Sequence, residues 1–416
     1  MTEHGTPAVD SDRLWQSLVE ISHFGATPAG GLHRLAASAE DGQARDYVVE
    51  AARAIGCTIR IDALGNTFVR RAGTDSQAKA ILIGSHLDSQ PLGGKYDGIY
   101  GVMAGLEVLR ALHASNTSTQ RSIEVAVWTN EEGARFSPAM MGAAFFAGKF
   151  TAEELHSRVD VDGVTLGESL NAIGYHGHDV VAPDEYACYL EIHIEQGPIL
   201  ERDNIDIGVV TAVQGMRWFR VHLSGQSGHS GTYPMEGRKD ALTASAEVVT
   251  GVQRIGLDQP NIGRATVGHL LVTPNSPNVV PGHVELMVEF RHPDVAMLDV
   301  MTSQLYALLK DVGARTDVAV QVNQELDSAT INFDPQIIDV VEKAAESTGL
   351  TSRRMISGAG HDACQVNGLM PSGMIFIPCV DGISHAENED ITQEWATNGA
   401  KVLIQTVLDM DRVRAI

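Results

Sequence analysis

Residues 80–113 have the sequence AILIGSHLDSQPLGGKYDGIYGVMAGLEVLRALH, in which an apolar strand, a polar glycine-rich loop and a helix follow one another. Three other short apolar runs also end abruptly in polar or glycine-rich segments. The predicted strands are Ala80–Gly84, Ile123–Trp128, Tyr189–Ile194 and Met374–Pro378, and the predicted helices include Gly101–His113 and Gln336–Ser347. Strands of this kind alternating with helices predict an α/β sheet covered on both faces. Because ligands bind beyond the carboxyl ends of such strands, we expect the functional residues there.

The middle of the chain has a different order of elements. We predict a strand at 218–225, a helix at Arg238–Ile255, strands at Ala265–Thr273 and His283–Phe290, a helix at Val295–Val312 and a strand at Val318–Leu326. This order is the split βαβ, ferredoxin-like pattern. A chain of 416 residues is also long enough for two domains. We therefore predict an α+β domain at residues 215–330, inserted into a discontinuous α/β catalytic domain made of residues 1–214 and 331–416.

Composition excludes several classes of partner. The formal charge is 30 − 53 = −23, which argues against binding to nucleic acid or to an anionic membrane. No apolar run approaches the ~18 residues of a membrane span, and residues 1–15 lack the basic start and apolar stretch of a signal peptide. The four cysteines form no CxxC pair, which favours a reducing compartment. We expect a cytoplasmic protein.

The polar segment after the first strand contains three candidate site residues. His86 and Asp88 are two positions apart at a strand end, so both can project to the same side. Histidine is the commonest protein metal ligand, and a nearby carboxylate such as that of Asp88 can fix its tautomer. Asp97 has two carboxylate oxygens with which to bridge two cations, but aspartate also often caps a helix. Both interpretations of Asp97 stay open at this point.

Three further segments supply polar residues near strand ends. Glu131 and Glu132 follow an apolar strand and are either exposed loop residues or a metal ligand beside a base. Strand alternation places His193 on one face with two glutamates, and that face is either solvated or part of a site. His385 alone would be a surface histidine. Together, these residues predict two cation sites with mixed nitrogen and oxygen ligands, a donor set suited to Zn, Mn or Co.

Several blocks in register resemble a known family. The motifs HLD, YDG, NEEG, EIHIEQGP, GHSGT, NVVPG, GHDA and SHAENE follow in order from about Leu82 to Glu389. They resemble the M20-type metallo-amidohydrolases, in the branch of N-carbamoyl-L-amino acid hydrolase, β-ureidopropionase and allantoate amidohydrolase. The resemblance implies a mixed-sheet, zinc-aminopeptidase-like catalytic domain with an inserted ferredoxin-like lid and dimerisation domain. It also implies two divalent ions per subunit, zinc first, with manganese, cobalt or nickel as alternatives.

The resemblance assigns roles to individual residues. His86, Asp97 and His193 would hold one ion, and Asp97, Glu132 and His385 the other. Glu131 would be the catalytic base, and Asp88 is expected among the catalytic residues with Glu131 and His229. Peptidase and aminoacylase branches tend to have an acidic residue where this chain has His193, so His193 favours a carbamoyl or ureido substrate over a peptide.

The expected substrate is a small ureido compound that bears a carboxylate. The resemblance implies that Asn278 and Arg291 bind this carboxylate, and that Gln196 and Gly360 line the pocket. His229 would reach the partner subunit's site in a homodimer and stabilise the oxyanion. Tyr233 and His292–Pro293 depart from the family pattern and leave substrate identity open. Allantoate amidohydrolase and β-ureidopropionase are the nearest alternatives, with a dipeptidase, an aminoacylase or a non-catalytic scaffold behind them.

Overall fold

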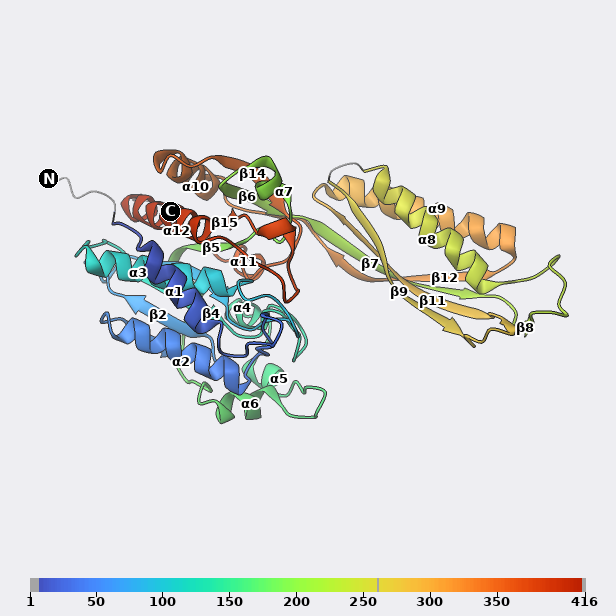
Figure 1. Ribbon diagram of the computed structural model, residues 1–416, viewed down its shortest axis with the longest axis horizontal. Helices are drawn as coiled ribbons and strands as arrows, with labels where there is room; N and C mark the ends of the chain where they lie inside the picture. The colour runs from blue at the N-terminus through green and yellow to red at the C-terminus, as the bar shows by residue number, and fades with distance from the viewer. Residues whose placement is uncertain (1–6, 260–261, 414–416) are drawn as a thin grey trace. The chain divides into compact units, whose positions relative to one another are not determined.

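The computed structural model describes residues 7–259 and 262–413, which form two compact units (Figure 1). The first unit takes in Met1–Thr211 and Phe333–Ile416, and the second is Ala212–Asn332. Among the described residues there is no helix whose length and apolarity would let it cross a bilayer. The expectation about a signal peptide concerns residues 1–15, of which 1–6 lie outside the described range.

The larger sheet is mixed and has nine strands in the order β1-β2-β4-β3-β5-β15-β6-β13, with β14 paired to β6. It belongs to the first unit except for β13 and the last two residues of β6, which fall within Ala212–Asn332. Its central strands β4, β3, β5 and β15 run parallel to one another. The strands are β1 (Thr58–Ile61), β2 (Thr67–Arg71), β3 (Ala80–His86), β4 (Ile123–Trp128), β5 (Tyr186–Ile194), β6 (Ile207–Val213), β13 (Ile331–Asn332), β14 (Ser352–Ser357) and β15 (Ser372–Ile377). The predicted α/β fold with a mixed sheet is confirmed.

Helices lie on both faces of this sheet. On one face, α3 and α12 pack so closely that a Cβ on Gly101 or Gly399 would meet Ile192 of β5. On the other face, Ala363 of α11 donates its N–H to Glu191 of β5 at 2.8 Å. The helices of the first unit are α1 (Ser11–Ile21), α2 (Ala39–Arg53), α3 (Ile99–Ala114), α4 (Met141–Phe146), α5 (Ala152–His156), α6 (Leu166–Ala172), η1 (Pro183–Glu185), α7 (Ile199–Asp203), α10 (Pro335–Ser347), α11 (Ala363–Val366), η2 (Val380–Gly382) and α12 (Gln393–Arg412).

The ends of the elements differ from the prediction in a way that matters for the site. The first predicted strand stopped at Gly84, but β3 continues through His86, so that the histidine is the last strand residue. Similarly, α3 begins at Ile99 rather than Gly101. Hydrophobic periodicity misses the end of β3 because Ser85 and His86 are polar and yet buried.

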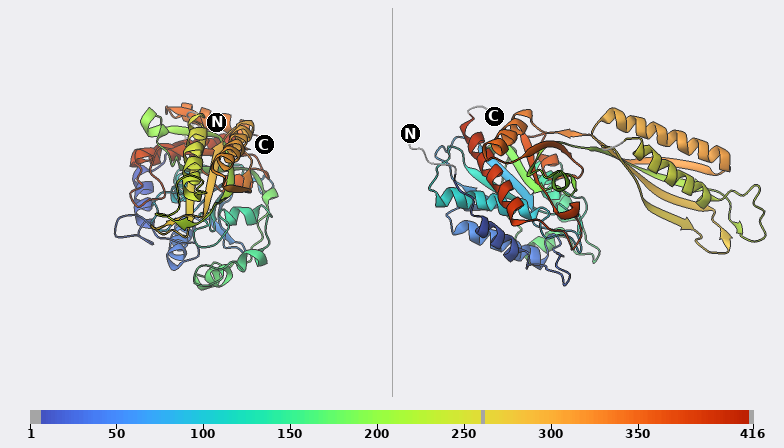
Figure 2. Two further views of the ribbon diagram at one scale, coloured as in Figure 1. Left: turned by 90° about the vertical axis from the view of Figure 1, so that its right-hand side faces the viewer. Right: turned by 45° about the horizontal axis from the view of Figure 1, so that its top comes forward.

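The second unit is an antiparallel four-stranded sheet in the order β12-β7-β11-β9. Two helices cover one face of the sheet, as both views in Figure 2 show. The elements are β7 (Gly215–Ser224), β8 (Gly228–His229), α8 (Ala241–Leu257), β9 (Arg264–Thr273), β10 (Val279–Val280), β11 (His283–His292), α9 (Val295–Thr316) and β12 (Ala319–Ser328). The βαββαβ order confirms the ferredoxin-like prediction. The predicted start of α8 at Arg238 is wrong, because the Asp240 side chain caps the helix by accepting from Leu242 N and Thr243 N.

Candidate metal centre

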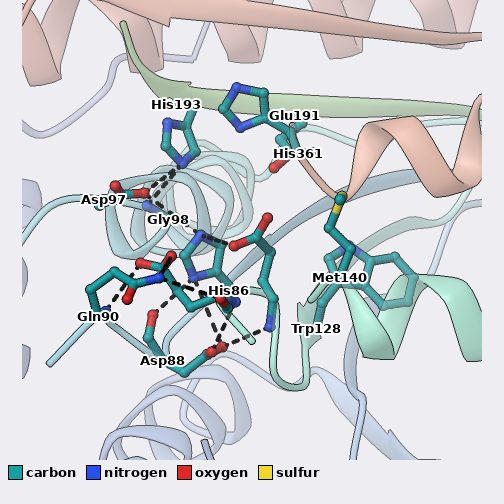
Figure 3. Close-up of polar contacts among 12 residues, drawn as sticks. His86, Asp88, Gln90, Asp97, Gly98, Trp128, Met140, Glu191, His193 and His361 are labelled. Atoms are coloured by element: carbon teal, nitrogen blue, oxygen red, sulfur yellow. Dashed lines mark hydrogen bonds and ion pairs between the residues drawn. The ribbon is translucent and has the colours of Figure 1, made fainter. Parts of the chain in front are cut away.

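Two histidines meet at one edge of the sheet in the first unit. β3 and β5 are parallel neighbours, so their carboxyl ends bring His86 and His193 together. Both side chains point toward Asp97, which comes from the loop before α3 (Figure 3). The distance from Asp97 Oδ1 is 3.0 Å to His193 Nε2 and 3.8 Å to His86 Nε2. These three side chains are at least 95% buried.

Asp97 also belongs to a second cluster. Its other oxygen, Oδ2, lies 3.3 Å from His385 Nε2, and the same nitrogen lies 3.5 Å from Glu132 Oε2. Within each trio the ligand atoms all lie within 4.8 Å of one another. The expected partition into two trios that share Asp97 is therefore geometrically possible. The alternative in which Asp97 caps a helix is wrong, because Gly98 is the N-cap residue of α3.

Backbone carbonyls fix the orientation of both buried histidines. His86 Nδ1 lies 2.9 Å from Asp88 O, and His193 Nδ1 lies 2.9 Å from Ile194 O. Each carbonyl accepts the Nδ1 proton, so in the neutral ring the Nε2 lone pair is the one that faces Asp97. The N–H of Gly98 donates to His193 Nε2 at 3.1 Å, which agrees with this tautomer.

The Asp88 carboxylate has a different task from the one expected. Its Oδ1 lies 3.9 Å from His86 Nδ1, so the Asp88 carbonyl, rather than its carboxylate, sets the tautomer of His86. The carboxylate instead accepts from the backbone N–H groups of Glu131 and Glu132, at 3.2 Å each. Asp88 thereby fixes the turn that presents both glutamates.

Glu131 is a buried side chain rather than an exposed loop residue. Its Oε2 lies 3.5 Å from His86 Nε2, so it stands beside the first trio. Burial raises its pKa well above the usual value, and the nearby Asp362 carboxyl adds to the effect. A buried carboxyl beside the first trio, with its pKa raised, is the kind of group that can take up a proton as a general base.

Electrostatics in the cluster favour bound cations. Burial lowers the pKa of His193, but the Asp97 carboxylate outweighs it and raises that pKa to about 9. Burial and Asp97 together raise the pKa of Glu132 to about 8. The protein therefore holds protons tightly at the points where the two trios converge, and a divalent ion can replace them. The mixed nitrogen and oxygen donors suit zinc, manganese or cobalt, so these residues fit two divalent ions.

Several supporting residues were not predicted from the sequence. Glu389 accepts from the N–H groups of Tyr96 and Asp97 at 3.0 Å each and so holds the Asp97 loop. Gln90 Nε2 donates to Glu132 Oε2 at 2.9 Å. The SHAENE motif contained Glu389, but no spacing rule links it to a loop almost three hundred residues earlier in the chain.

The two expected pocket residues of the first unit lie beside the cluster. Gln196 Nε2 donates to Asp97 Oδ2 at 2.7 Å, and its own Oε1 is buried without a hydrogen-bond partner. The loop of Gly360 is anchored by His361, whose ring packs against His193 at 4.6 Å between ring centroids. A Cβ on Gly360 would lie 3.3 Å from Met140 Cε.

The second unit brings only two of its three expected residues together. His229 in β8 pairs with Val279 of β10, and Asn278 is the residue just before Val279. His229 and Asn278 therefore lie close together. Arg291 lies near the other end of the sheet, where it pairs with Met216 of β7. Arg291 lies eight positions after His283 in β11, which corresponds to ~27 Å of extended strand. Within one copy of the chain, a small substrate cannot contact both Arg291 and the His229–Asn278 pair.

Comparison with known proteins identifies the family. The model of peptidase family M20/M25/M40 matches residues 82–409. N-carbamoyl-L-amino-acid amidohydrolase of Rhizobium meliloti is 41% identical over 401 residues, which cover 96% of each chain. The chain belongs to the M20 family, in its hydantoinase/carbamoylase amidase branch. It is a metallohydrolase of the amidase type that acts on C–N bonds, with two candidate metal sites.

Two further relatives define the range of the branch. A solved hydantoinase/carbamoylase family amidase from Burkholderia multivorans has a TM-score of 0.94 and 47% identity, covering 99% of this chain and 100% of its own. Ureidoglycolate hydrolase of Oryza sativa subsp. japonica is 34% identical and covers 95% of this chain and 84% of its own. This M20 amidase therefore has relatives that are named for different ureido substrates.

Proposed function

We propose that the protein hydrolyses the ureido C–N bond of an N-carbamoyl-L-amino acid. One water is consumed, and the products are the amino acid, ammonia and carbon dioxide. The observation that carries this proposal is the pair of trios sharing Asp97, with a histidine, His193, in the position where peptidase branches tend to have a carboxylate. Similarity to the Rhizobium enzyme over nearly the whole chain supports the same substrate class.

We assign the cofactor as two divalent ions, zinc first, with manganese, cobalt or nickel as alternatives. When bound, such ions supply Lewis acidity and lower the pKa of a coordinated water. His86, Asp97 and His193 would hold one ion, and Asp97, Glu132 and His385 the other. This assignment leaves Glu131, whose Oε2 lies 3.5 Å from His86 Nε2, as a carboxylate beside the first trio that is not used as a ligand.

Glu131 would move the proton in the reaction. Its Oε2 takes a proton from the attacking water and returns it to the departing nitrogen, which leaves as a neutral amine. The position of Glu131 beside the first trio supports this role, and burial, which raises its pKa, favours uptake of the proton. Asp88 would keep Glu131 in place through the backbone of the turn.

His229 would stabilise the oxyanion. Its Nδ1 lies 3.0 Å from the Gly231 N–H and 3.3 Å from the Thr232 N–H, both of which donate to it. The proton of a neutral His229 therefore sits on Nε2, which makes Nε2 a hydrogen-bond donor. A donor of this kind, held in place by two backbone contacts, suits a developing negative charge.

Arg291 and Asn278 would bind the substrate carboxylate, with Gln196 and Gly360 lining the pocket. The distance between Arg291 and the pair Asn278 and His229 supports a homodimer, because one substrate can reach both only if Asn278 and His229 come from a second copy. We accordingly propose that the inserted domain, residues 215–330, serves as a lid and dimerisation domain.

The unpaired cysteines are consistent with a cytoplasmic location, which we also propose.

Hydrolysis of ureidoglycolate, or of a related ureide such as allantoate, is the second candidate. The 34% identity to the rice enzyme favours it, and the metal trios do not distinguish between these substrates. Steady-state rates on metal-replete protein would decide, with N-carbamoyl-methionine, ureidopropionate, allantoate and ureidoglycolate compared under the same conditions. We expect the highest kcat/KM on the carbamoyl amino acid. A higher value on any of the other ureides, on dipeptides or on N-acetyl amino acids would overturn the proposal.

A further inference from the structure

The face of the second unit's sheet that its helices do not cover carries a row of charged side chains. β11 alternates strictly, with Phe290 and Val288 in the core beneath α8 and α9. Glu289 and Arg291 are two residues apart and therefore lie on the opposite face, where each side chain is between one quarter and one third exposed. Arg291 is the residue that the proposed function assigns to the substrate carboxylate.

Glu289 holds the guanidinium of Arg291 at two points. Arg291 Nε donates to Glu289 Oε1 at 2.6 Å, and Nη2 donates to Glu289 Oε2 at 3.2 Å. This two-point contact uses the Nε side of the planar guanidinium and fixes the plane in which the remaining N–H groups lie. An arginine on a solvated strand would otherwise sample many rotamers, and that freedom would be lost on substrate binding.

Trp218 holds Glu289 in turn. It is the cross-strand partner of Glu289 on β7, and its indole Nε1 donates to Glu289 Oε2 at 2.6 Å. The contacts therefore run from a rigid indole to the carboxylate and from the carboxylate to the guanidinium. Each of these residues lies on a regular strand, so the backbone positions of all three are set by the sheet.

We propose that Glu289, held by Trp218, is a positioning residue that orients Arg291 for the substrate carboxylate. This inference rests on the proposed function. Glu289 does not touch the reacting atoms, so its effect is expected in KM for carboxylate-bearing substrates rather than in kcat. The opposite possibility is that Glu289 competes with the substrate for Arg291, in which case its removal would lower KM.

The test uses kinetics on a matched pair of substrates with the full-length, metal-replete protein. These are an N-carbamoyl amino acid and its carboxamide, which lacks the negative charge. Glu289→Gln should raise KM for the carboxylate about 10-fold, the lower end of what a charge-assisted hydrogen bond contributes, with kcat changed less than about two-fold. Its kcat/KM on the carboxamide should match that of the wild type. Trp218→Phe keeps the ring, loses the N–H donor and should give a smaller rise in KM.

Two further variants make the result specific. Glu285→Gln is the matched control, because Glu285 lies on the same strand and face and pairs instead with Arg220. It should leave both substrates unaffected. Arg291→Gln should raise KM for the carboxylate strongly, and adding Glu289→Gln to it should cause no further loss, because Glu289 acts only through Arg291.

The outcomes separate the two proposals. If the wild type hydrolyses N-carbamoyl amino acids but Glu289→Gln leaves KM unchanged, lowers it, or impairs both substrates equally, the positioning role is wrong and the proposed function stands. Additive losses in the double variant would also refute the role. If the wild type hydrolyses no N-carbamoyl amino acid, the proposed function fails, and the role of Glu289 fails with it.

Discussion

Asp97 contacts His193 through one carboxylate oxygen, with 3.0 Å between Oδ1 and Nε2, and keeps the other oxygen for His385. No other described residue is shared by both candidate trios. Asp97→Asn would replace one of these oxygens with an amide nitrogen that cannot bind a cation. We expect loss of both ions, measured by elemental analysis after dialysis, and loss of activity by at least about 1,000-fold. Retention of two tightly bound ions would contradict the shared-ligand assignment.

Glu131→Gln separates the base from the ligands. The amide keeps the size of the side chain but cannot accept the proton of water. We expect kcat to fall by about 100- to 10,000-fold, the usual contribution of a general base, while metal content stays at the wild-type value. Unchanged turnover, or loss of the metal together with the activity, would show that Glu131 is not the base.

Gly98 tests the close approach of the α3 N-terminus to His86. Gly98 has φ 67°, and a Cβ there would lie 2.1 Å from His86 Nε2. Gly98→Ala should displace the ligand histidine and reduce metal content, in addition to the ~1–2 kcal/mol cost of a left-handed alanine. Gly174→Ala is the matched control, since Gly174 has φ 77° and no atom within 4 Å of its Cβ position.

The Gly98 comparison is read from thermal unfolding and metal analysis together. Both glycine variants should lower the free energy of unfolding of the metal-free protein, and only Gly98→Ala should weaken metal binding. Equal metal affinity in the two variants would show that His86 tolerates displacement.

Glu389→Gln should weaken metal binding without removing a ligand. Glu389 accepts from the N–H groups of Tyr96 and Asp97, so it holds the loop that presents Asp97. Losses for such supporting partners of metal ligands are about 10- to 100-fold in metal affinity or activity, and we expect a change of this size in titrations with zinc or manganese. Glu387→Gln is the control. Glu387 lies two residues before Glu389 in the same loop, and its carboxylate accepts instead from the Thr27 hydroxyl. An effect of Glu387→Gln as large as that of Glu389→Gln would indicate a general disturbance of the loop.

The pH dependence of stability should change sign on metal binding. In the metal-free protein the pKa of His193 is about 9, against about 6.5 when unfolded, so the native state holds an extra proton between these values. Its stabilisation is complete below about pH 6.5 and is lost as the pH rises through about 9. The pKa of Glu132, raised to about 8, acts in the same direction. The melting temperature of chelator-treated protein should therefore fall from pH 7 to pH 9.

Added metal should reverse this trend, because the ions displace the same protons. The stabilisation by zinc or manganese should grow from pH 6 to pH 9, and titration calorimetry in buffers of different ionisation enthalpy should detect proton release. A metal affinity that does not depend on pH across this range would mean that the ions bind elsewhere.

Local signals in the sequence pointed to only part of the predicted ligand set, and the family resemblance supplied Asp97 and His385, which stand in loops. His86 and His193 lie at or next to the carboxyl ends of buried strands, and Glu132 follows another, so locating the strands placed these three residues near strand ends. Their convergence at one edge followed from the parallel order expected of an α/β sheet. The ferredoxin-like unit was also predicted from hydrophobic periodicity, since its strands and helices each show the spacing of apolar residues that is typical of that element.

Local sequence determined which segments form strands and helices and which residue types end them, because burial periodicity and capping depend on near neighbours. Only the tertiary structure decided that backbone carbonyls rather than Asp88 set the histidine tautomers, that Asp97 does not cap α3, and that Glu389 holds the Asp97 loop. It also decided that Arg291 lies in the four-stranded sheet of the second unit, whereas Asn278 lies beside a separate two-stranded sheet. These relationships depend on strand register and on contacts between segments far apart in the chain, which no local pattern of side chains encodes.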